Sequence, residues 1–449
     1  MKKTDLLPTH GNLLDTYNID AIGRNSELFY FVKLLNSITG SYSIALDGRW
    51  GSGKTFFVKQ TQMIFDAHNE FTQIGHDITE EERCKIKETW AKICRNNHEE
   101  TWEPTPAVCV YFDAWEYDND DNPLASLIYQ ISETASKAYK FEGERNYLDI
   151  AVNIIDLISG KNYRDLINSL KKTSITQDVK VEMTLRETIN NYLNELLPEH
   201  GERLLVFIDE LDRCNPCYAV NLLEKIKHYF ANENITFVFS VNLEQLQYTI
   251  QQHYGSGFNA HKYLDRFVDL TIPMPRVNWS KYNESIGLYS STLLYQVAEE
   301  IVRKHQMEMR EASRYYTALK IMSEKRTHSN QNTADKEFCY YFVIPIALGL
   351  YKHDLSRYHD FIEGKDFSPL GEIASIEDFQ DAIGTLLLSS REEKTVTTVS
   401  KKVEEAYNAL FIGAKKKESR SFGSTHIRES TLTYFFNTIS MLNDAATLD

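Results

Sequence analysis

The stretch that decides the fold of this chain reads Gly48-Arg49-Trp50-Gly51-Ser52-Gly53-Lys54-Thr55. It fits the pattern G-x-x-x-x-G-K-[ST], whose glycines allow successive backbone N–H groups to face a phosphate. A β-prone run from Ser41 to Leu46 precedes it, and a helical pattern that begins at Lys54 adds the positive end of a helix dipole. We therefore predict a phosphate-binding loop that extends to Phe56, rather than a glycine turn that matches by chance. Lys54 is expected to reach the β- and γ-phosphates of a nucleoside triphosphate, and the Thr55 hydroxyl to ligate Mg²⁺.

A second informative stretch is the apolar run from Leu204 to Ile208, which ends in two carboxylates, Asp209 and Glu210. Strands buried in a parallel sheet read as such continuous apolar runs, and the carboxyl ends of the strands form the ligand-binding edge. Asp209 is predicted to hold the Mg²⁺ shell, directly or through water. Glu210 is predicted to polarise the attacking water, which requires a carboxylate within hydrogen-bond reach. An exposed acidic turn after a buried strand is the alternative.

Strand-like and helix-like segments alternate over the first 275 residues, which favours a parallel sheet covered on both faces. The predicted fold class is α/β: a parallel sheet sandwiched by helices, followed by an α-helical lid and a C-terminal helical region. Charged residues from about 68 to 103 predict a helical insertion on the surface. The further expected strands are Pro106–Phe112, Ile235–Val241 and Val268–Ile272. The expected helices include Ser26–Ile38, most of Ser126–Leu197 with a candidate break at Lys171–Lys180, and a helix started by Asn215-Pro216.

After Pro275 the chain is expected to be helical to its end. We expect a core at residues 1–276, with helical insertions at about 66–104 and 135–200, a helical lid at 277–322 and a C-terminal helical region at 323–449. The polar stretch Ser323–Lys336 is the candidate for a mobile loop or a joint. The basic run Lys415–Lys417 is expected on a solvated surface turn, with a contact to a phosphate backbone as the alternative.

Whole-chain composition narrows the class of protein. The 449 residues, 42% hydrophobic and 25% charged, suit a globular chain of two or three domains. The formal net charge of -15 argues against a surface devoted to nucleic acid, because phosphates require clustered Lys and Arg. Six cysteines favour reduced thiols and a cytoplasmic setting. The N-terminus lacks the apolar core of a signal peptide, and no apolar stretch approaches the ~20 residues that cross a bilayer, so no membrane partner is expected.

The residues that follow Glu210 leave alternatives open. Asp212 and Arg213 could brace the site or position a neighbouring subunit, or they could pair with each other. Cys214 and Cys217 form a lone C-x-x-C, for which two small residues flanking a helix start are expected rather than a zinc site.

Four motifs together resemble the KAP family of P-loop NTPases, within the wider STAND and AAA+-like group. The resemblance covers roughly residues 15 to 320. The loop alone would be generic, whereas the tryptophan motif and the acidic motif make the match specific. The motifs are W-G-S-G-K-T in the loop, F-D-A-W-E-Y at Phe112–Tyr117, D-E-L-D-R-C at Asp209–Cys214 and K-Y-L-D-R-F-V-D-L at Lys262–Leu270. The resemblance implies an ATP-binding core with an additional strand between the phosphate-loop strand and the acidic strand.

The resemblance also implies roles for single residues. Asn242 resembles the polar sensor of the γ-phosphate or the lytic water, with a strand-end turn residue as the alternative. Gly23 and Arg24 resemble the G-R element that borders the adenine pocket, or else form a helix-entry turn. Arg266 resembles an arginine finger, which neutralises charge on the transferring phosphoryl group, or else pairs with neighbouring aspartates. Arg310 resembles the nucleotide-sensing arginine of a lid helix, or else lies on a solvated helix face.

The aromatic motif lies at the carboxyl end of its strand, the edge where α/β sheets bind ligands. Trp115 is expected to pack beneath the phosphate loop or in the core. Asp113 and Glu116 could reach the outer shell of the metal.

Two features depart from the family. Many relatives carry transmembrane helices inserted in the core, and this sequence has none that we can recognise, which puts membrane signalling in doubt. The family often shows D-D where this chain has Asp209-Glu210, and the longer second carboxylate suits hydrolysis at least as well.

The sequence and the resemblance together predict a Mg²⁺-dependent ATPase with Lys54, Glu210, Asn242 and Arg266 as catalytic residues. Its nucleotide cycle is expected to move the lid and to drive switching or assembly of a homo-oligomer. By analogy with the family's distribution, we expect an effector protein as partner and a role in prokaryotic defence against phage. The alternatives are a nucleotide-dependent scaffold with little turnover and a DNA-acting motor.

Overall fold

The structure is a computed structural model that describes residues 7–73, 78–139, 147–158, 177–230, 232–288, 292–326 and 333–446. It divides into two compact units, Leu7–Asn278 and Trp279–Asp449. The phosphate loop and the two carboxylates belong to the first unit, and Arg310 belongs to the second.

The first unit contains a five-stranded parallel sheet in the order β2-β3-β4-β1-β5. This sheet confirms the α/β fold class, and β4 is the additional strand that the resemblance places between the loop strand and the acidic strand. The last strand begins two residues later than expected from the sequence. The strands are β1 Tyr42–Asp47, β2 Ala107–Asp113, β3 Arg203–Asp209, β4 Ile235–Val241 and β5 Leu270–Pro273.

The position of each strand in the sheet explains its composition. β4 lies between β1 and β3 and is buried at every residue, so its sequence Ile-Thr-Phe-Val-Phe-Ser-Val is almost entirely apolar. β5 is an edge strand and is mostly exposed, where Pro273 is tolerated because an edge lacks one set of ladder hydrogen bonds. The registers align Asp113 with Asp209 and Asp209 with Ser240. The strands therefore end together at one edge.

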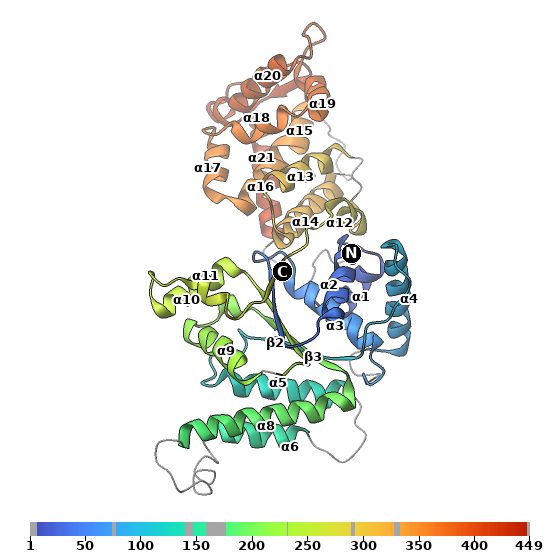
Figure 1. Cartoon of the computed structure of the whole chain (residues 1–449). Coiled ribbons are helices and arrows are strands. Elements are labelled where there is room, and N and C mark those ends of the chain that lie inside the picture. The colour runs from blue at the N-terminus through green and yellow to red at the C-terminus, as the bar shows by residue number, and fades with distance from the viewer. Residues whose placement is uncertain are drawn as a thin grey trace. The chain divides into compact units, whose positions relative to one another are not determined.

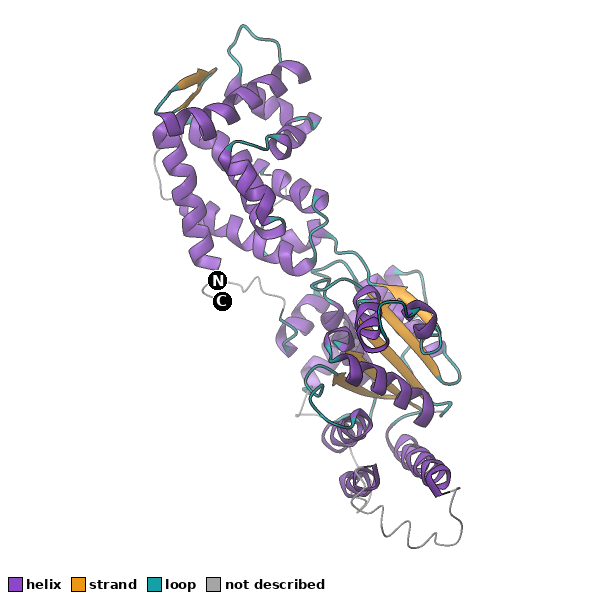
Figure 2. Ribbon diagram, turned by 90° about the vertical axis from the view of Figure 1, so that its left-hand side faces the viewer, coloured by secondary structure: helices purple, strands orange, loops and turns teal. Residues whose placement is uncertain are grey.

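Helices cover both faces of the sheet (Figures 1 and 2). One face presents Val110, Ile208 and Phe237, which are buried in a core shared with the helices on that side. The helix α3 contacts β2 and β4 on the other face, and its neighbours pack around it. The first group comprises α5 Pro123–Ala138, α6 Tyr147–Ile158, α8 Gln177–His200 and α9 Pro216–Tyr229; the second comprises α1 His10–Asn18, α2 Asn25–Ser37, α3 Lys54–His68 and α4 Glu80–Asn96.

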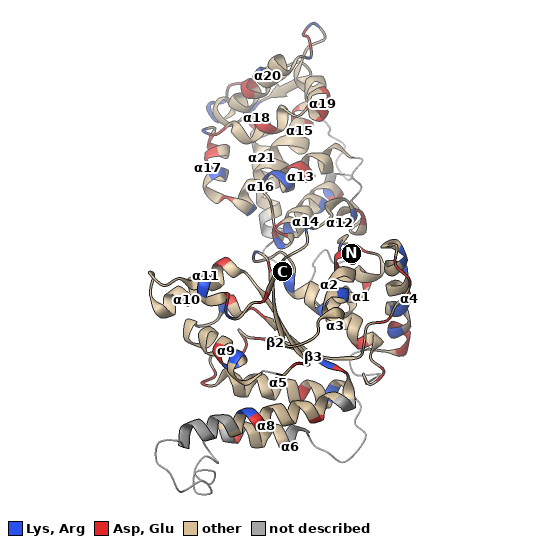
Figure 3. Ribbon diagram, in the orientation of Figure 1, with Lys and Arg blue, Asp and Glu red and all other residues tan. Residues whose placement is uncertain are grey.

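The helix starts follow from local sequence. α9 begins with Asn215 as N-cap, whose side chain accepts from the Cys217 N–H, and with Pro216 as first residue, as the sequence predicts. In the charged stretch after residue 66, α4 begins with a capping box formed by Thr79 and Glu82. Figure 3 shows Lys and Arg interspersed with Asp and Glu on α4 and α8. Most of the candidate break Lys171–Lys180 lies outside the described residues, and α8 begins within it at Gln177.

The second unit is mainly helical. Ser323–Lys336 is not wholly a loop, because α14 continues to Arg326 and α15 begins at Ala334; residues 327–332 lie outside the described residues. Its helices are α12 Trp279–Ser285, α13 Leu293–Lys304, α14 Met309–Arg326, α15 Ala334–Phe338, α16 Ile344–His353, α17 Leu355–Glu363, α18 Ser368–Ala374, α19 Glu377–Leu387, α20 Val396–Asn408 and α21 Glu429–Ala446. Across the described parts of both units, none of the helices combines the length and the apolar character that a membrane crossing needs.

The expectation of an entirely helical C-terminal part is wrong at one place. Strands β6 Arg420–Phe422 and β7 Thr425–Ile427 form an antiparallel hairpin. Gly423 adopts a positive φ in its turn, where an added Cβ would lie 2.4 Å from the Leu388 carbonyl oxygen, so this approach requires glycine. Strands of three residues are too short to show alternation in the sequence. The run Lys415–Lys417 before the hairpin is exposed, as predicted.

Candidate functional site

The phosphate loop connects β1 to α3, as the sequence predicts. Gly51 and Gly53 adopt φ of 84° and 89°, values that other residues rarely reach. A Cβ on Gly48 would lie 2.7 Å from the Met274 Cβ and 2.8 Å from the Ser52 Oγ. The Ser52 Oγ is itself buried and has no hydrogen-bond partner among the described residues. A buried orphaned hydroxyl in a glycine-rich loop suits a site that a polar ligand completes.

Lys54 lies over its own loop. The Nζ donates to the Gly48 carbonyl at 2.7 Å and to the Arg49 carbonyl at 3.3 Å. Burial lowers the pKa of this ammonium, and the carboxylates of Asp212 and Asp209 oppose that effect. The group is therefore a buried cation whose partners are mainly loop carbonyls, which an incoming phosphate could replace as the closer negative charge.

Of the other residues predicted at the nucleotide site, Arg24 contacts the loop, Gly23 precedes α2 and Phe56 is on α3. The Arg24 Nη2 donates to the Ser52 carbonyl at 3.0 Å, and the side chain is 5% exposed. Gly23 adopts a φ of 71° in the turn before α2, and Phe56 is buried. The structure thus brings Arg24 against the backbone of the phosphate loop.

Thr55 and Asp209 join the two motifs. The Thr55 Oγ1 donates to the Asp209 Oδ2 at 2.5 Å, although the two residues are 154 positions apart. Tyr111 on β2 donates to the same oxygen at 2.9 Å. Asp209 is 1% exposed. A hydroxyl and a carboxylate at this distance are the hard oxygen donors that Mg²⁺ prefers, so the residues present fit this ion.

Glu210 lies beside this pair in a left-handed backbone conformation, with φ of 60°. Its carboxylate forms an ion pair with the Arg213 Nε. Burial raises the pKa of Glu210 to about 7; Asp209, Asp212 and Asp113 add to the shift, whereas Arg213 opposes it. A carboxylate with such a pKa can accept a proton near neutral pH.

Asp212 and Arg213 bind other residues rather than each other. The Trp50 Nε1 donates to the Asp212 Oδ2 at 2.5 Å, and burial raises the pKa of that carboxyl group. The Arg213 guanidinium lies 5.7 Å from the Trp50 ring centroid and 5.6 Å from that of Trp115. These contacts favour the alternative in which Asp212 and Arg213 brace the site.

The expectation for Trp115 is wrong. Its side chain is 53% exposed, so it lies neither in the core nor beneath the loop. Asp113 accepts from the backbone N–H groups of Trp115 and Glu116, at 3.1 Å and 3.4 Å, and so turns the chain outward. Glu116 is exposed.

For Asn242 and Arg266 the structure bears on the alternative interpretations as a turn residue and as a partner of neighbouring aspartates. The Asn242 Oδ1 accepts from the N–H groups of Glu244 and Gln245, which makes it the N-cap of α10 Leu243–Tyr254. Arg266 is exposed after α11 Ala260–Leu264, and no ion pair joins it to another described residue. Asp265 instead contacts His261, at 3.5 Å.

Several contacts of the site had no signal in the sequence. Tyr111 reads as part of an apolar strand, yet its hydroxyl holds Asp209. Ser240 is fully buried in register with Asp209, and its hydroxyl has no hydrogen-bond partner among the described residues.

Arg310, the predicted nucleotide-sensing arginine, is exposed on α14 of the second unit.

Comparisons with known proteins agree with this geometry. A family model described as "KAP family P-loop domain" matches residues 25–325. That range includes the phosphate loop, the five strands and the two carboxylates, and it begins one residue after Arg24. The chain is also similar to the uncharacterized protein MJ0182 of Methanocaldococcus jannaschii, with 26% identity over 28% of this chain and 84% of that protein.

Proposed function

The chain belongs to the KAP family of P-loop NTPases, and from that premise we propose that it binds Mg²⁺-ATP at residues 48–56 and hydrolyses it. The hydrogen bond between the Thr55 Oγ1 and the Asp209 Oδ2, 2.5 Å long, is the observation that carries the proposal. It brings the end of a phosphate loop and a strand-end carboxylate to one point, as metal-assisted phosphoryl transfer requires.

Nucleotide binding follows from the loop. Its backbone N–H groups and the N-terminus of α3 receive the phosphates, and the Lys54 ammonium leaves the Gly48 and Arg49 carbonyls to contact them. Arg24 keeps the loop in shape through the Ser52 carbonyl. ATP is preferred over GTP in the proposal only because the family resemblance points to adenine.

Thr55 and Asp209 would hold the metal, with Tyr111 orienting the carboxylate. Bound Mg²⁺ neutralises charge on the phosphates. The arrangement of oxygen donors is already present between Thr55 and Asp209. Little reorganisation of these side chains is therefore needed when the nucleotide arrives.

Glu210 is proposed to accept a proton from the attacking water. Its raised pKa, about 7, suits that role. Its ion pair with Arg213 must open or rotate before the carboxylate can bind water freely. Asn242 would contact the γ-phosphate only after release from the cap of α10.

Arg266 is proposed to act on the nucleotide of a second copy of the chain. It is exposed and has no ion-pair partner among the described residues, as a group reserved for an intermolecular contact would be. Arg310 is proposed to sense the nucleotide from the lid.

We further propose that the nucleotide cycle switches or assembles a cytoplasmic homo-oligomer that acts with an effector protein, in defence against phage. This step rests on family analogy. A scaffold with little turnover is the second candidate, because the Glu210–Arg213 ion pair and the Asn242 cap both occupy groups that hydrolysis needs. A DNA-acting motor receives no support from the net charge of -15.

Phosphate release from the purified chain tests the proposal. Glu210→Gln should lower the rate about 10²-fold or more, the usual loss on removing a general base. The matched control is Glu202→Gln, an exposed carboxylate immediately before β3, at the opposite end of that strand. Equal rates in the two variants and the wild type would favour the scaffold. Absence of heat on mixing the wild type with Mg²⁺-ATP in a calorimeter would contradict nucleotide binding itself.

A further inference from the structure

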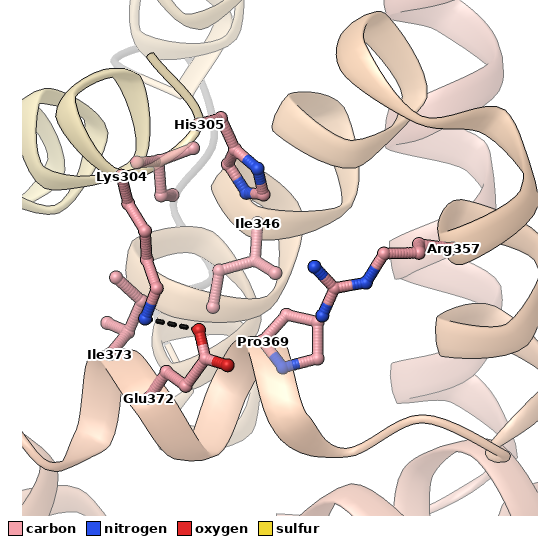
Figure 4. Close-up of a pocket in the computed structure, with 8 residues that line it drawn as sticks. Lys304, His305, Ile346, Arg357, Pro369, Glu372 and Ile373 are labelled. Carbon is pink, nitrogen blue, oxygen red and sulfur yellow. Dashed lines mark ion pairs between the residues drawn. The ribbon is translucent and has the colours of Figure 1, made fainter.

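A second polar pocket lies within the C-terminal unit, independent of the phosphate loop. The ends of four helices meet at it: His305 follows α13, Ile346 is on α16, Arg357 is in the first turn of α17 and Glu372 is on α18. Figure 4 shows the His305 ring, the Arg357 guanidinium and the Lys304–Glu372 ion pair around a common space. The lining residues are Ile301, Lys304, His305, Ile346, Arg357, Pro369, Glu372 and Ile373.

The pocket holds nitrogen donors that other described residues do not satisfy. The Arg357 Nε and Nη2 both donate to the Asp366 Oδ2, at 3.4 Å each, and Nη2 also donates to the Ser368 Oγ at 3.1 Å. The Arg357 Nη1 has no hydrogen-bond partner among the described residues. The half-buried His305 ring likewise makes no side-chain hydrogen bond there, and its one ring neighbour is His353, at 5.2 Å between centroids.

Charges of both signs surround His305, and each of the two fixed cations at the pocket has a carboxylate partner. Burial is the main cause that lowers its pKa to about 4, and the neighbouring His353, Arg357 and Lys304 lower it further. Glu372 opposes them and is itself paired with Lys304. The neighbouring His353 in turn lies 3.9 Å from the carboxylate of Glu311 on α14. An anion in the pocket would therefore meet the Lys304 ammonium and the Arg357 guanidinium, from two helices, in competition with the Glu372 and Asp366 carboxylates.

The size of the pocket and the direction of its hydrogen-bond donors limit which anions can bind there. The enclosed volume is about 10 Å³, close to that of one water, so only a terminal oxygen of a ligand can enter. A planar carboxylate binds arginine best through two parallel donors, and Asp366 already occupies the Nε and Nη2 donors of Arg357. A single phosphate oxygen can instead accept one hydrogen bond from each of several donors that approach it from different directions.

We propose that this pocket takes up one oxygen of a terminal phosphate group, of either inorganic phosphate or a phosphomonoester, through Lys304, His305 and Arg357, while the rest of the phosphate group lies at the mouth. The body of a larger ligand stays outside, at the mouth of the pocket. The site is separate from the proposed nucleotide site, and neither proposal requires the other.

A titration of the His305 ring by NMR in the full chain tests the proposal at this site alone. The chain carries Lys54→Ala, so that phosphate is not taken up by the loop. A His305→Gln spectrum assigns the resonance. Inorganic phosphate should raise the pKa of His305 by about one unit or more, the effect of an opposite charge at hydrogen-bond distance. An unchanged pKa at tens of millimolar phosphate would overturn the proposal.

Two variants distinguish specific binding of phosphate by Arg357 from a general effect of removing one positive charge. Arg357→Gln should weaken phosphate binding about tenfold, as loss of a charge-assisted hydrogen bond does. Arg303→Gln is the matched control, since Arg303 is an exposed arginine on the same helix as Lys304 and pairs with Glu300. Equal weakening in both would overturn the proposal. Should Arg357→Gln not fold, calorimetry of His305→Gln with phosphate decides instead, and undiminished binding there also overturns it.

A second ligand determines whether the pocket binds free phosphate or the phosphate group of a larger molecule. Phosphoserine serves as the phosphomonoester probe, beside inorganic phosphate. Tighter binding of phosphoserine indicates a larger ligand whose body contacts the mouth of the pocket, and tighter binding of inorganic phosphate indicates the free ion. Both outcomes support the pocket, whereas binding of acetate as tight as that of phosphate would contradict the geometric argument.

Discussion

Thr55 shows how a single hydroxyl can serve two purposes at the proposed nucleotide site. Its Oγ1 donates to Asp209, which Tyr111 also contacts, so the carboxylate is held in place by two hydroxyls. A hydrogen bond to a buried charged group stabilises by about 1.5–3 kcal/mol. In the proposed site the same oxygen would also be a ligand of the metal.

Thr55→Val should separate these purposes. Without the hydroxyl, affinity for ATP in the presence of Mg²⁺ should fall about tenfold or more, because the proposed metal contact is lost. Affinity in the presence of EDTA should change little, because the other lost contact, the hydrogen bond to Asp209, joins two protein residues and not the nucleotide. Calorimetry under the two conditions measures this. The matched control is Thr61→Val on the same helix, whose buried hydroxyl only bonds the Phe57 carbonyl. An equal loss of Mg²⁺-dependent affinity in the control would refute the metal assignment.

Arg213 illustrates the other residue-scale feature, a cation placed between two half-exposed indoles. Trp50 and Trp115 belong to the loop and to the turn after β2, and Glu210 to the acidic strand end. Each cation–π contact at an exposed position stabilises by about 0.5–1 kcal/mol. Together they connect the three segments that surround the site.

At the scale of elements, the site depends on where parallel strands end. The Gly48 N–H donates to Val241 at the end of β4, and the Met274 N–H after β5 donates to Asp47 at the end of β1. The first residues of the loop are therefore fixed by two neighbouring strands. These hydrogen bonds fix the position from which the glycine-rich turn of the loop begins.

Gly48→Ala tests this rigidity. The new Cβ would meet the Met274 Cβ at 2.7 Å in a place where backbone hydrogen bonds prevent easy adjustment. We expect a loss of about 1–3 kcal/mol in the free energy of unfolding, the usual cost of overpacking, and weaker nucleotide binding. Urea denaturation and calorimetry measure the two. Gly11→Ala on α1 is the control, since nothing lies within 4 Å of its added Cβ; a similar loss there would show that the effect is not specific to the loop.

At the scale of the whole molecule, two features reach beyond a single site. Arg266 is exposed on the first unit, which suits a contact between copies of the chain. The second unit carries His305, whose pKa is lowered to about 4 mainly by burial. Both can be tested with the full chain.

Mixing two inactive variants tests the contact between copies. Arg266→Ala should bind ATP but hydrolyse it at least 10³-fold more slowly, as expected for loss of an arginine finger. Mixed with Glu210→Gln protein, it should regain part of the activity, because each copy supplies what the other lacks. Lys262→Ala, an exposed cation one turn earlier, is the control and should keep full activity. No recovery on mixing would argue against an intermolecular finger.

The pH dependence of stability should reflect His305. Its pKa is about 4 in the folded chain and near 6.5 when unfolded, so between these values the unfolded state binds more protons. The free energy of unfolding should therefore fall as the pH drops from about 6.5 towards 4. The ring is half-exposed, so the loss should be about 1 kcal/mol. Chemical denaturation of the wild type and His305→Gln across this range isolates the effect, and parallel curves would contradict it.

Local sequence pattern was sufficient to predict several parts of this protein. The loop from Gly48 to Thr55 and the run that ends in Asp209 and Glu210 could be read directly, because glycine conformations and buried strands leave a mark within about ten residues. The order of β4 between β1 and β3 came from the family resemblance. Alternation of strands and helices was enough to predict a sheet with helices on both faces.

The side-chain contacts across long sequence separations could be identified only in the folded chain. Tyr111 contacts Asp209 over 98 residues and Trp50 contacts Asp212 over 162. Trp115 is exposed although a large indole ring favours burial, and β6 and β7 form a hairpin in a helical region. The physical reason is that such contacts depend on the positions of separate elements after packing, whereas sequence pattern records only the preference of each element for water, core or turn.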